Sequence, residues 1–233
     1  MRLAVLSDVH ANLDALRAVI AEADARGADA IVCLGDVVGY GPDPADCVDL
    51  VRERCTSTVI GNHDAAVARD EGLAVLPPDG QAAALAQRGW LTPDQTAWLA
   101  GLPLTAVAHG VTLVHASPDE PAQWHRLDSF GAVQAQFGAF ETEVCFVGHS
   151  HKPAVVSDQL GVTRVRPGHR YLINVGSVGQ PRDHDPRAAF GLYDTDTMSY
   201  ELVRVYYDVA RTRLRVSERG LPTGLGERLA IGV

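Results

Sequence analysis

The chain of 233 residues has a formal net charge of −9 at pH 7, and 46% of its residues are hydrophobic. This composition is ordinary for a globular protein, and the length suits one generous domain or two small ones. The acidic balance argues against a nucleic-acid partner, because such a partner normally requires a basic patch. It does not exclude a small anionic substrate, because bound metal ions reverse the local field.

The cysteines and the N-terminus bear on the compartment. Four cysteines contain no Cys-x-x-Cys pair, which argues against a disulfide framework in a chain of this size. No apolar run approaches the roughly 18 residues that span a bilayer. A strand pattern begins at residue 2, and the first residues lack the features of a signal peptide. We therefore expect a cytoplasmic protein without a membrane partner.

The first quarter of the chain alternates strand and helix patterns. Residues 2–6 predict a buried strand, and residues 12–26 predict a helix from apolar side chains at helical spacing. A second strand is expected at 30–34, a helix at 44–54 and a third strand at 57–60. This order predicts parallel strands with covering helices.

The rest of the chain becomes richer in strands. Residues 63–100 predict two or three short helices, residues 104–108 and 111–115 a β-hairpin, and residues 128–137 a helix. A closing helix is expected at 207–216. Further strands are predicted at 144–147, 153–157, 163–166, 171–175, 188–193 and 199–206.

These elements predict an α+β fold. Two mixed sheets packed face to face, with helices on the outside, satisfy both halves of the chain and form an α/β/β/α sandwich. We find no internal repeat, low-complexity tract or linker, so we expect a single domain over residues 1–233.

Polar side chains that bind metals follow five apolar runs. In an open α/β sheet the carboxyl ends of parallel strands lie at one edge, where ligands bind. The hairpin strand before His115 need not be parallel to the others, so its placement is open. Each motif alone also fits a turn, a helix cap or a loop histidine. The motifs are Ser7-Asp8-Val9-His10, Gly35-Asp36, Gly61-Asn62-His63-Asp64, His115 and Gly148-His149-Ser150-His151.

The chemistry of this set favours a pair of transition-metal ions. Carboxylate and amide oxygens with imidazole nitrogens suit manganese first, with iron, zinc, cobalt or nickel as alternatives. Seven candidate ligands exceed one tetrahedral site and match two ions that share a carboxylate. Paired ions stabilise the attacking and leaving oxygens of a phosphoryl displacement.

The five motifs together resemble those of the calcineurin-like metallophosphoesterases, over residues 3 to about 183. Two further segments are similar to a bacterial subgroup related to diadenosine tetraphosphatases and protein phosphatases. They are Gly35–Pro42 and Asn174–Arg182. Where such relatives commonly have a proline after the asparagine, this chain has Val175, which affects no expected ligand.

The resemblance implies a role for each motif residue. A hydroxide between the two ions would attack phosphorus. His63 would face the phosphate, and Asp64 would orient His63. The resemblance assigns Asp8, His10, Asp36 and His151 to the first ion, and Asp36, Asn62, His115 and His149 to the second.

Contacts to the substrate are less defined by sequence. Asn12 and Arg182 are candidates for binding a phosphate, with helix capping and a surface salt bridge as the respective alternatives. The loop 117–128, which contains Trp124, follows a ligand histidine and is expected to border the pocket, although Trp124 equally suits packing. We expect the remaining histidines to be structural: His109, His125, His169 and His184.

The sequence therefore predicts a hydrolase of small phosphate esters, most directly phosphodiesters or nucleotides. The alternatives are a non-catalytic binding or scaffold protein on the same fold, a protein phosphatase, and a nuclease. A homo-oligomer is left open.

Overall fold

The computed structural model describes residues 1–162 and 164–233. These residues form eight α-helices and two five-stranded sheets, which run in the orders β10-β9-β1-β2-β3 and β4-β5-β6-β8-β7. The first sheet contains β1 (Arg2–Leu6), β2 (Ala30–Cys33), β3 (Ser57–Thr58), β9 (Ala188–Asp194) and β10 (Ser199–Val205). The second contains β4 (Thr105–Ala108), β5 (Val111–Val114), β6 (Val144–Val147), β7 (Ala154–Ser157) and β8 (Tyr171–Asn174).

Both sheets mix parallel and antiparallel pairs. In the first, β1 and β2 are parallel, as are β2 and β3, whereas β9 runs antiparallel to β1 and to β10. In the second, β5, β6 and β8 are parallel, and β4 and β7 are antiparallel edge strands. The expected hairpin is β4–β5, and its second strand proves parallel to β6.

Strand alternation divides the core into layers. Successive side chains of a strand point to opposite faces. Leu3 and Val5 therefore pack between the sheets against Phe146 of the second sheet. Ala4 and Leu6 pack on the outer face, under the helices. The predicted sandwich of two mixed sheets flanked by helices is thus confirmed.

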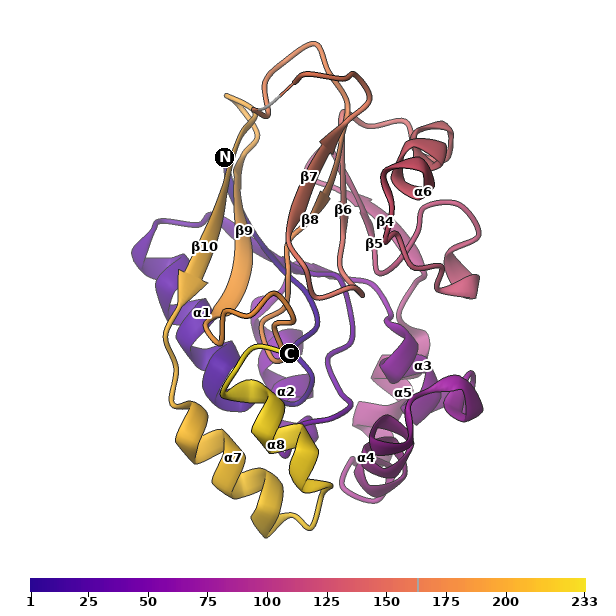
Figure 1. The fold of residues 1–233 in the computed structure, drawn as a ribbon, viewed down its shortest axis with the longest axis vertical. Helices are drawn as coiled ribbons and strands as arrows, with labels where there is room; N and C mark the ends of the chain where they lie inside the picture. Colours follow the sequence, from indigo (N-terminus) through magenta and orange to yellow (C-terminus); the bar gives the residue numbers. More distant parts are fainter. Residues whose placement is uncertain (163) are drawn as a thin grey trace.

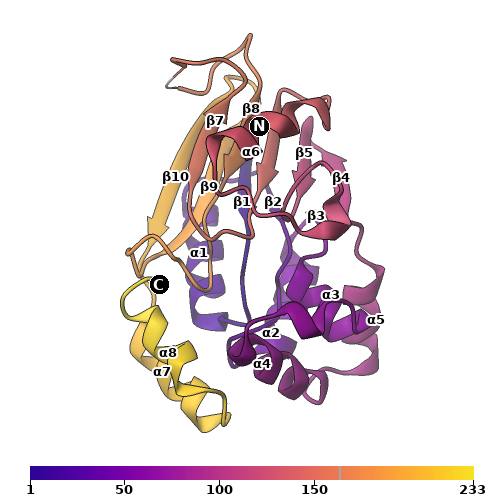
Figure 2. The ribbon, with the colours of Figure 1, turned by 45° about the vertical axis from the view of Figure 1, so that its right-hand side comes forward.

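The helices lie on the outer faces and below the strands (Figure 1). Figure 2 shows α7 and α8 side by side at the lower end of the molecule. Within the described residues, every helix is too short or too polar to cross a bilayer. The helices are α1 (Leu13–Ala25), α2 (Pro44–Arg54), α3 (Asn62–Arg69), α4 (Pro78–Arg88), α5 (Pro93–Gly101), α6 (Phe130–Gln134), α7 (Val209–Glu218) and α8 (Thr223–Leu229).

Two predicted strands differ from the structure. The third strand was expected at 57–60, but pairing stops at Thr58 and Ile60 N instead bonds to Pro103 O. The predicted strand at 163–166 begins on residue 163, which lies outside the described residues, and 164–166 form no strand. There the Tyr171 hydroxyl bonds to the backbone of Arg164 and Arg166, so a side chain replaces a neighbouring strand.

The C-terminal helices also differ from expectation. The helix predicted at 207–216 is α7, shifted by two residues, and α8 follows it without having been predicted. Gly224 and Gly226 make the sequence of α8 a poor helix former. Tertiary packing outweighs this low propensity, because Leu225 and Leu229 of α8 are buried.

Candidate metal centre

The expected ligands come together at the carboxyl ends of the parallel strands. Asp8 follows β1, Asp36 follows β2, and Asn62 begins α3 just after β3. From the second sheet, His115 follows β5, while His149 and His151 follow β6. The two sheets pack face to face with these ends at the same side, so loops distant in sequence meet over the inter-sheet core.

The backbone in these loops is unusual. Five of the residues have left-handed conformations with φ between 47° and 64°, which non-glycine residues rarely adopt. Such conformations persist where the surrounding structure fixes them, and they concentrate at functional sites. Here they turn the chain sharply after each strand. The five are Asp8, His10, Asp36, His149 and His151.

The side chains form three overlapping groups of potential metal donors, and one of them, His10, Asp36 and His63, shares a residue with each of the other two. The first trio is Asp8, His10 and His151, and the second trio is Asp36, His115 and His149. Within each trio the donor atoms lie within 4.8 Å of one another. The trios adjoin, because Asp36 Oδ2 is 3.3 Å from His115 Nε2 and 3.6 Å from His10 Nε2. The Asn62 side-chain oxygen lies 3.2 Å from His115 Nε2.

Backbone carbonyls orient three of the imidazoles. Nδ1 of His10 bonds to Val38 O at 3.1 Å, and Nδ1 of His115 to Leu34 O at 2.8 Å. Nδ1 of His151 bonds to Gln180 O at 2.5 Å. A carbonyl accepts only, so Nδ1 must carry the hydrogen, and the lone pair of each neutral ring is on Nε2. This arrangement is typical of metal-binding histidines.

The inward-facing atoms are an electron-rich set that fits cations. His10 Nε2 and His151 Nε2 are 3.1 Å apart, a spacing at which two lone pairs need a proton or a metal ion near them. Asp8 Oδ1 is buried without a hydrogen-bond partner among the described residues, 3.3 Å from His151 Nε2. A buried unpaired carboxylate oxygen is costly unless a positive charge compensates it.

Burial and charge set the protonation of these groups. Burial opposes ionisation of Asp36, but His115 and His63 outweigh it and hold the pKa of Asp36 well below its usual value. Burial also opposes the charge of His115, but Asp36 raises the pKa of His115 to about 9. Burial lowers the pKa of His149 to about 4 and that of His10 well below its usual value. The last two rings are therefore neutral at pH 7, as metal binding requires.

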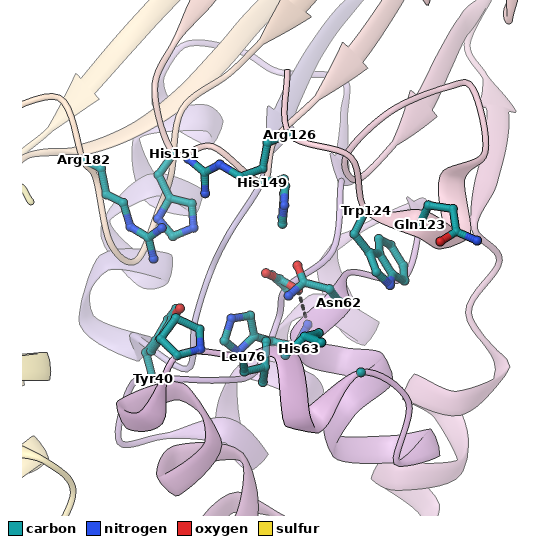
Figure 3. Close-up of a pocket in the computed structure, with 14 residues that line it drawn as sticks. Tyr40, Asn62, His63, Leu76, Gln123, Trp124, Arg126, His149, His151 and Arg182 are labelled. Carbon is teal, nitrogen blue, oxygen red and sulfur yellow. Dashed lines mark hydrogen bonds between the residues drawn. The ribbon is translucent and has the colours of Figure 1, made fainter. Parts of the chain in front are cut away.

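The two trios border a cavity of about 340 Å³. Figure 3 shows His149, His151 and Arg182 on one side of it, with Tyr40, His63 and Leu76 on the other. Trp124 and Arg126 come from the loop 117–128, which therefore borders the cavity. The opening thus combines metal-binding groups, two arginines and an apolar wall.

Comparisons with known proteins agree with this geometry. The model of the calcineurin-like phosphoesterase superfamily domain matches residues 1–198. The chain belongs to the calcineurin-like phosphoesterase superfamily.

Similar proteins cover the whole chain. An uncharacterized protein of Methanocaldococcus jannaschii is 36% identical over 99% of this chain and 98% of its own length. The crystal structure of a metallophosphoesterase from Sphaerobacter thermophilus is similar with a TM-score of 0.88 and 38% identity, over 100% of this chain and 99% of that one. A hypothetical protein from Pyrococcus horikoshii OT3 has the same fold, with a TM-score of 0.83 and 21% identity over 100% of this chain and 98% of that one.

One feature of this calcineurin-like site differs from the sequence-based expectation. Asp64 was expected to orient His63, but its carboxylate oxygens accept from Gly61 N and Val38 N, each at 3.0 Å. Asp64 occupies the third position of α3, from which a carboxylate reaches back to the free N–H groups at the helix start. It therefore fixes the two loops that carry Asp36 and Asn62. Burial and Asp36 raise the pKa of Asp64 to about 7.

The two residues expected to contact a phosphate, Asn12 and Arg182, lie in different environments in the structure. Asn12 is buried, and its side chain caps α1 through Ala15 N and donates to Gly179 O. Asn12 is therefore a helix-capping residue, and it does not line the cavity of the metal centre. Arg182 does line that cavity, and its guanidinium bonds to Gln180 Oε1 at 2.8 Å.

Several residues of the cavity were not predicted individually. Tyr40, Leu76 and Arg126 line it. Tyr40 lies in the family-like segment Gly35–Pro42, whereas Leu76 and Arg126 had no signal beyond their proximity to the predicted loops. The histidines expected to be structural lie outside it: His109, His125, His169 and His184.

Proposed function

We propose that this protein is a dinuclear metal-dependent phosphoesterase that hydrolyses small phosphate esters, most directly phosphodiesters or nucleotides. The observation that carries this proposal is the pair of adjoining trios, which meet at Asp36 and open on a cavity lined by His63 and Arg182. The family match and the 38% identical metallophosphoesterase of Sphaerobacter thermophilus support it.

In this proposal Asp36 is shared between two ions. The first trio would hold one ion with Asp36, and the second trio would hold the other with Asn62. His149 and His151 thus serve different ions although they are only two residues apart. Manganese is the first candidate for both ions, because mixed carboxylate and imidazole donors suit it. When bound, such ions lower the pKa of water and offset the negative charge of the phosphoryl group.

Side chains around the cavity complete the proposed reaction. Burial lowers the pKa of His63 to about 4, so its ring is neutral at pH 7. His63 would stabilise the charge that develops on the leaving oxygen by donating a hydrogen bond, a role that typically contributes about 10²–10³-fold to the rate. Arg182 would bind a phosphate oxygen. The substrate's organic group would lie against Trp124, Leu76 and Val75, and Val75 is 84% exposed at the rim. The volume of about 340 Å³ suits a small ester.

The test is hydrolysis of bis(p-nitrophenyl) phosphate by the manganese-loaded protein. We expect turnover that Asp36→Ala abolishes and that His63→Ala lowers at least about 100-fold. His109→Ala is the matched control, because His109 is exposed and remote from the cavity. Equal rates for wild type, Asp36→Ala and His63→Ala would refute the proposal.

Metal content measured on the same samples separates the alternatives. A protein that holds two ions per chain and hydrolyses no mono-, di- or cyclic phosphate would favour a binding or scaffold role. DNA binding that weakens steeply with salt would favour a nuclease.

A further inference from the structure

The orientation of His63 has no evident hydrogen-bond origin. Its backbone N–H donates to Asp36 Oδ1 at 2.8 Å, which places the start of α3. Its ring Nδ1, however, is buried without a hydrogen-bond partner among the described residues. The carboxylate of Asp64 is occupied by the backbone of Gly61 and Val38. Something other than a hydrogen bond at Nδ1 must therefore hold the imidazole.

Close packing encloses the ring instead. The Tyr40 ring lies beside it, with centroids 4.4 Å apart and planes at 52°. A Cβ atom added to Gly39 would lie 2.5 Å from His63 Nδ1, and one added to Gly80 would lie 3.3 Å from His63 Cε1. The Nδ1 edge therefore faces the chain at Gly39, and Nε2 is the nitrogen that remains available to a substrate.

Tyr40 is itself held tightly. It has φ of +55°, an outlier for a bulky residue, and is only 4% exposed. The guanidinium of Arg182 lies 5.6 Å above its ring, and the His10 ring is 4.7 Å away. Such a conformation persists where the surroundings over-determine it. Tyr40 thus contacts both proposed phosphate-facing side chains and one proposed ligand.

The C-terminal helices support this packing from behind. Tyr40 belongs to an apolar cluster with Val216 of α7 and Leu225 of α8. An ion pair of 3.0 Å between Arg228 and Asp79 joins α8 to α4, the helix that contains Gly80. These two helices lie beyond residues 1–198, the part matched by the family model.

We propose that Tyr40 is a positioning residue that directs Nε2 of His63 toward the leaving oxygen, with α7 and α8 as its support. The inference rests on the proposed function of His63. In the hydrolysis, a water oxygen bonds to phosphorus as the bond to the leaving oxygen breaks. His63 Nε2 donates a hydrogen bond to the leaving oxygen, which takes up the proton that the attacking water loses. Misplacing such a group by about 1 Å costs roughly 100-fold.

The kinetic test compares p-nitrophenyl and phenyl esters of thymidine 5′-monophosphate. Phenolate is the more basic leaving group, so its oxygen depends more on the hydrogen bond from His63 than the oxygen of p-nitrophenolate does. We expect Tyr40→Leu to lower kcat for the phenyl ester at least about tenfold more than for the p-nitrophenyl ester, as His63→Ala should. Tyr40→Phe keeps the ring and should retain the wild-type ratio. Tyr206→Leu is the matched control, because Tyr206 is 81% exposed.

Two kinetic results would overturn the inference. One is an equal loss on both esters in Tyr40→Leu. The other is a further change of the ratio when Tyr40→Leu is added to His63→Ala, because a residue that acts through His63 has no effect without it. Metal content must be the same in every variant.

A second measurement does not depend on turnover. In the zinc-loaded protein, the NMR signals of the His63 ring are assigned by their loss in His63→Ala. We expect Tyr40→Leu to shift and broaden them and Tyr206→Leu to leave them unchanged; unchanged signals in Tyr40→Leu would refute the inference. If wild type hydrolyses neither ester, the proposed function fails, whereas the NMR result still decides whether Tyr40 orients His63.

Discussion

Metal binding should stabilise the fold by an amount that can be worked out in advance. A ligand present at 100 times its Kd stabilises the native state by about 2.7 kcal/mol. Two ions therefore contribute about 5 kcal/mol. For a chain of this size each kcal/mol raises Tm by about 2–4 °C, so saturating manganese should raise the Tm of the EDTA-treated protein by about 10–20 °C.

The structure predicts how substitutions divide this shift. Asp36 lies near both trios and Asp8 belongs only to the first, so Asp36→Asn should remove most of the shift and Asp8→Asn about half. Asp94→Asn changes an exposed carboxylate with 78% of its side-chain surface accessible and should keep the full shift. Scanning fluorimetry with stepwise manganese and metal analysis measure all four proteins. A full shift in Asp36→Asn, or equal losses in the two site variants, would refute the sharing of Asp36.

Three further predictions concern a substrate contact, protonation and the C-terminal helices. Arg182→Ala should raise KM at least about tenfold with a smaller change in kcat; a loss confined to kcat would argue against phosphate binding in the ground state. In EDTA, the raised native pKa of His115, about 9 against about 6.5 unfolded, adds stability that is complete below pH 6.5 and lost as pH rises through 9. The Tm of the EDTA-treated protein should therefore decrease as pH rises from about 6.5 to about 9, and His115→Gln should make this decrease smaller. Arg215→Ala removes the ion-pair partner of buried Asp43 and should lower the free energy of unfolding in urea by about 2 kcal/mol, with no change in metal content; a loss below 0.5 kcal/mol would contradict this.

Much of the fold was readable because local pattern and tertiary environment agree. Residues 2–6 and 30–33 are short apolar runs that end in polar motifs, and they are buried parallel strands whose ends meet. The same coincidence brought the predicted metal donors together, since each lies within four residues of the end of a strand. The order of motifs along the chain thus carried information about their position in space.

The failures have equally local causes. Residues 164–166 have strand-like composition, but Arg166 N donates to the Tyr171 hydroxyl, and the carbonyls of Arg164 and Arg166 accept from that hydroxyl. The glycines of α8 concealed a helix that packing stabilises. Asp64 occupies a position in α3 that satisfies backbone N–H groups, and no spacing rule distinguishes that from a contact with His63. Tyr40 lies in the family-like segment Gly35–Pro42, but the sequence assigns it no role, because that role depends on its contacts in the folded chain.

The carbonyl contacts of the histidines have a consequence for metal exchange. His115 follows a strand of the second sheet, yet its ring is anchored on Leu34 O of the first. His149 N likewise donates to Asp8 Oδ2 across the two sheets. These hydrogen bonds hold the donor atoms of the two sheets in register. Under the proposed function, these bonds would remain while one ion is exchanged for another, so cellular metal supply would determine which ion the protein carries.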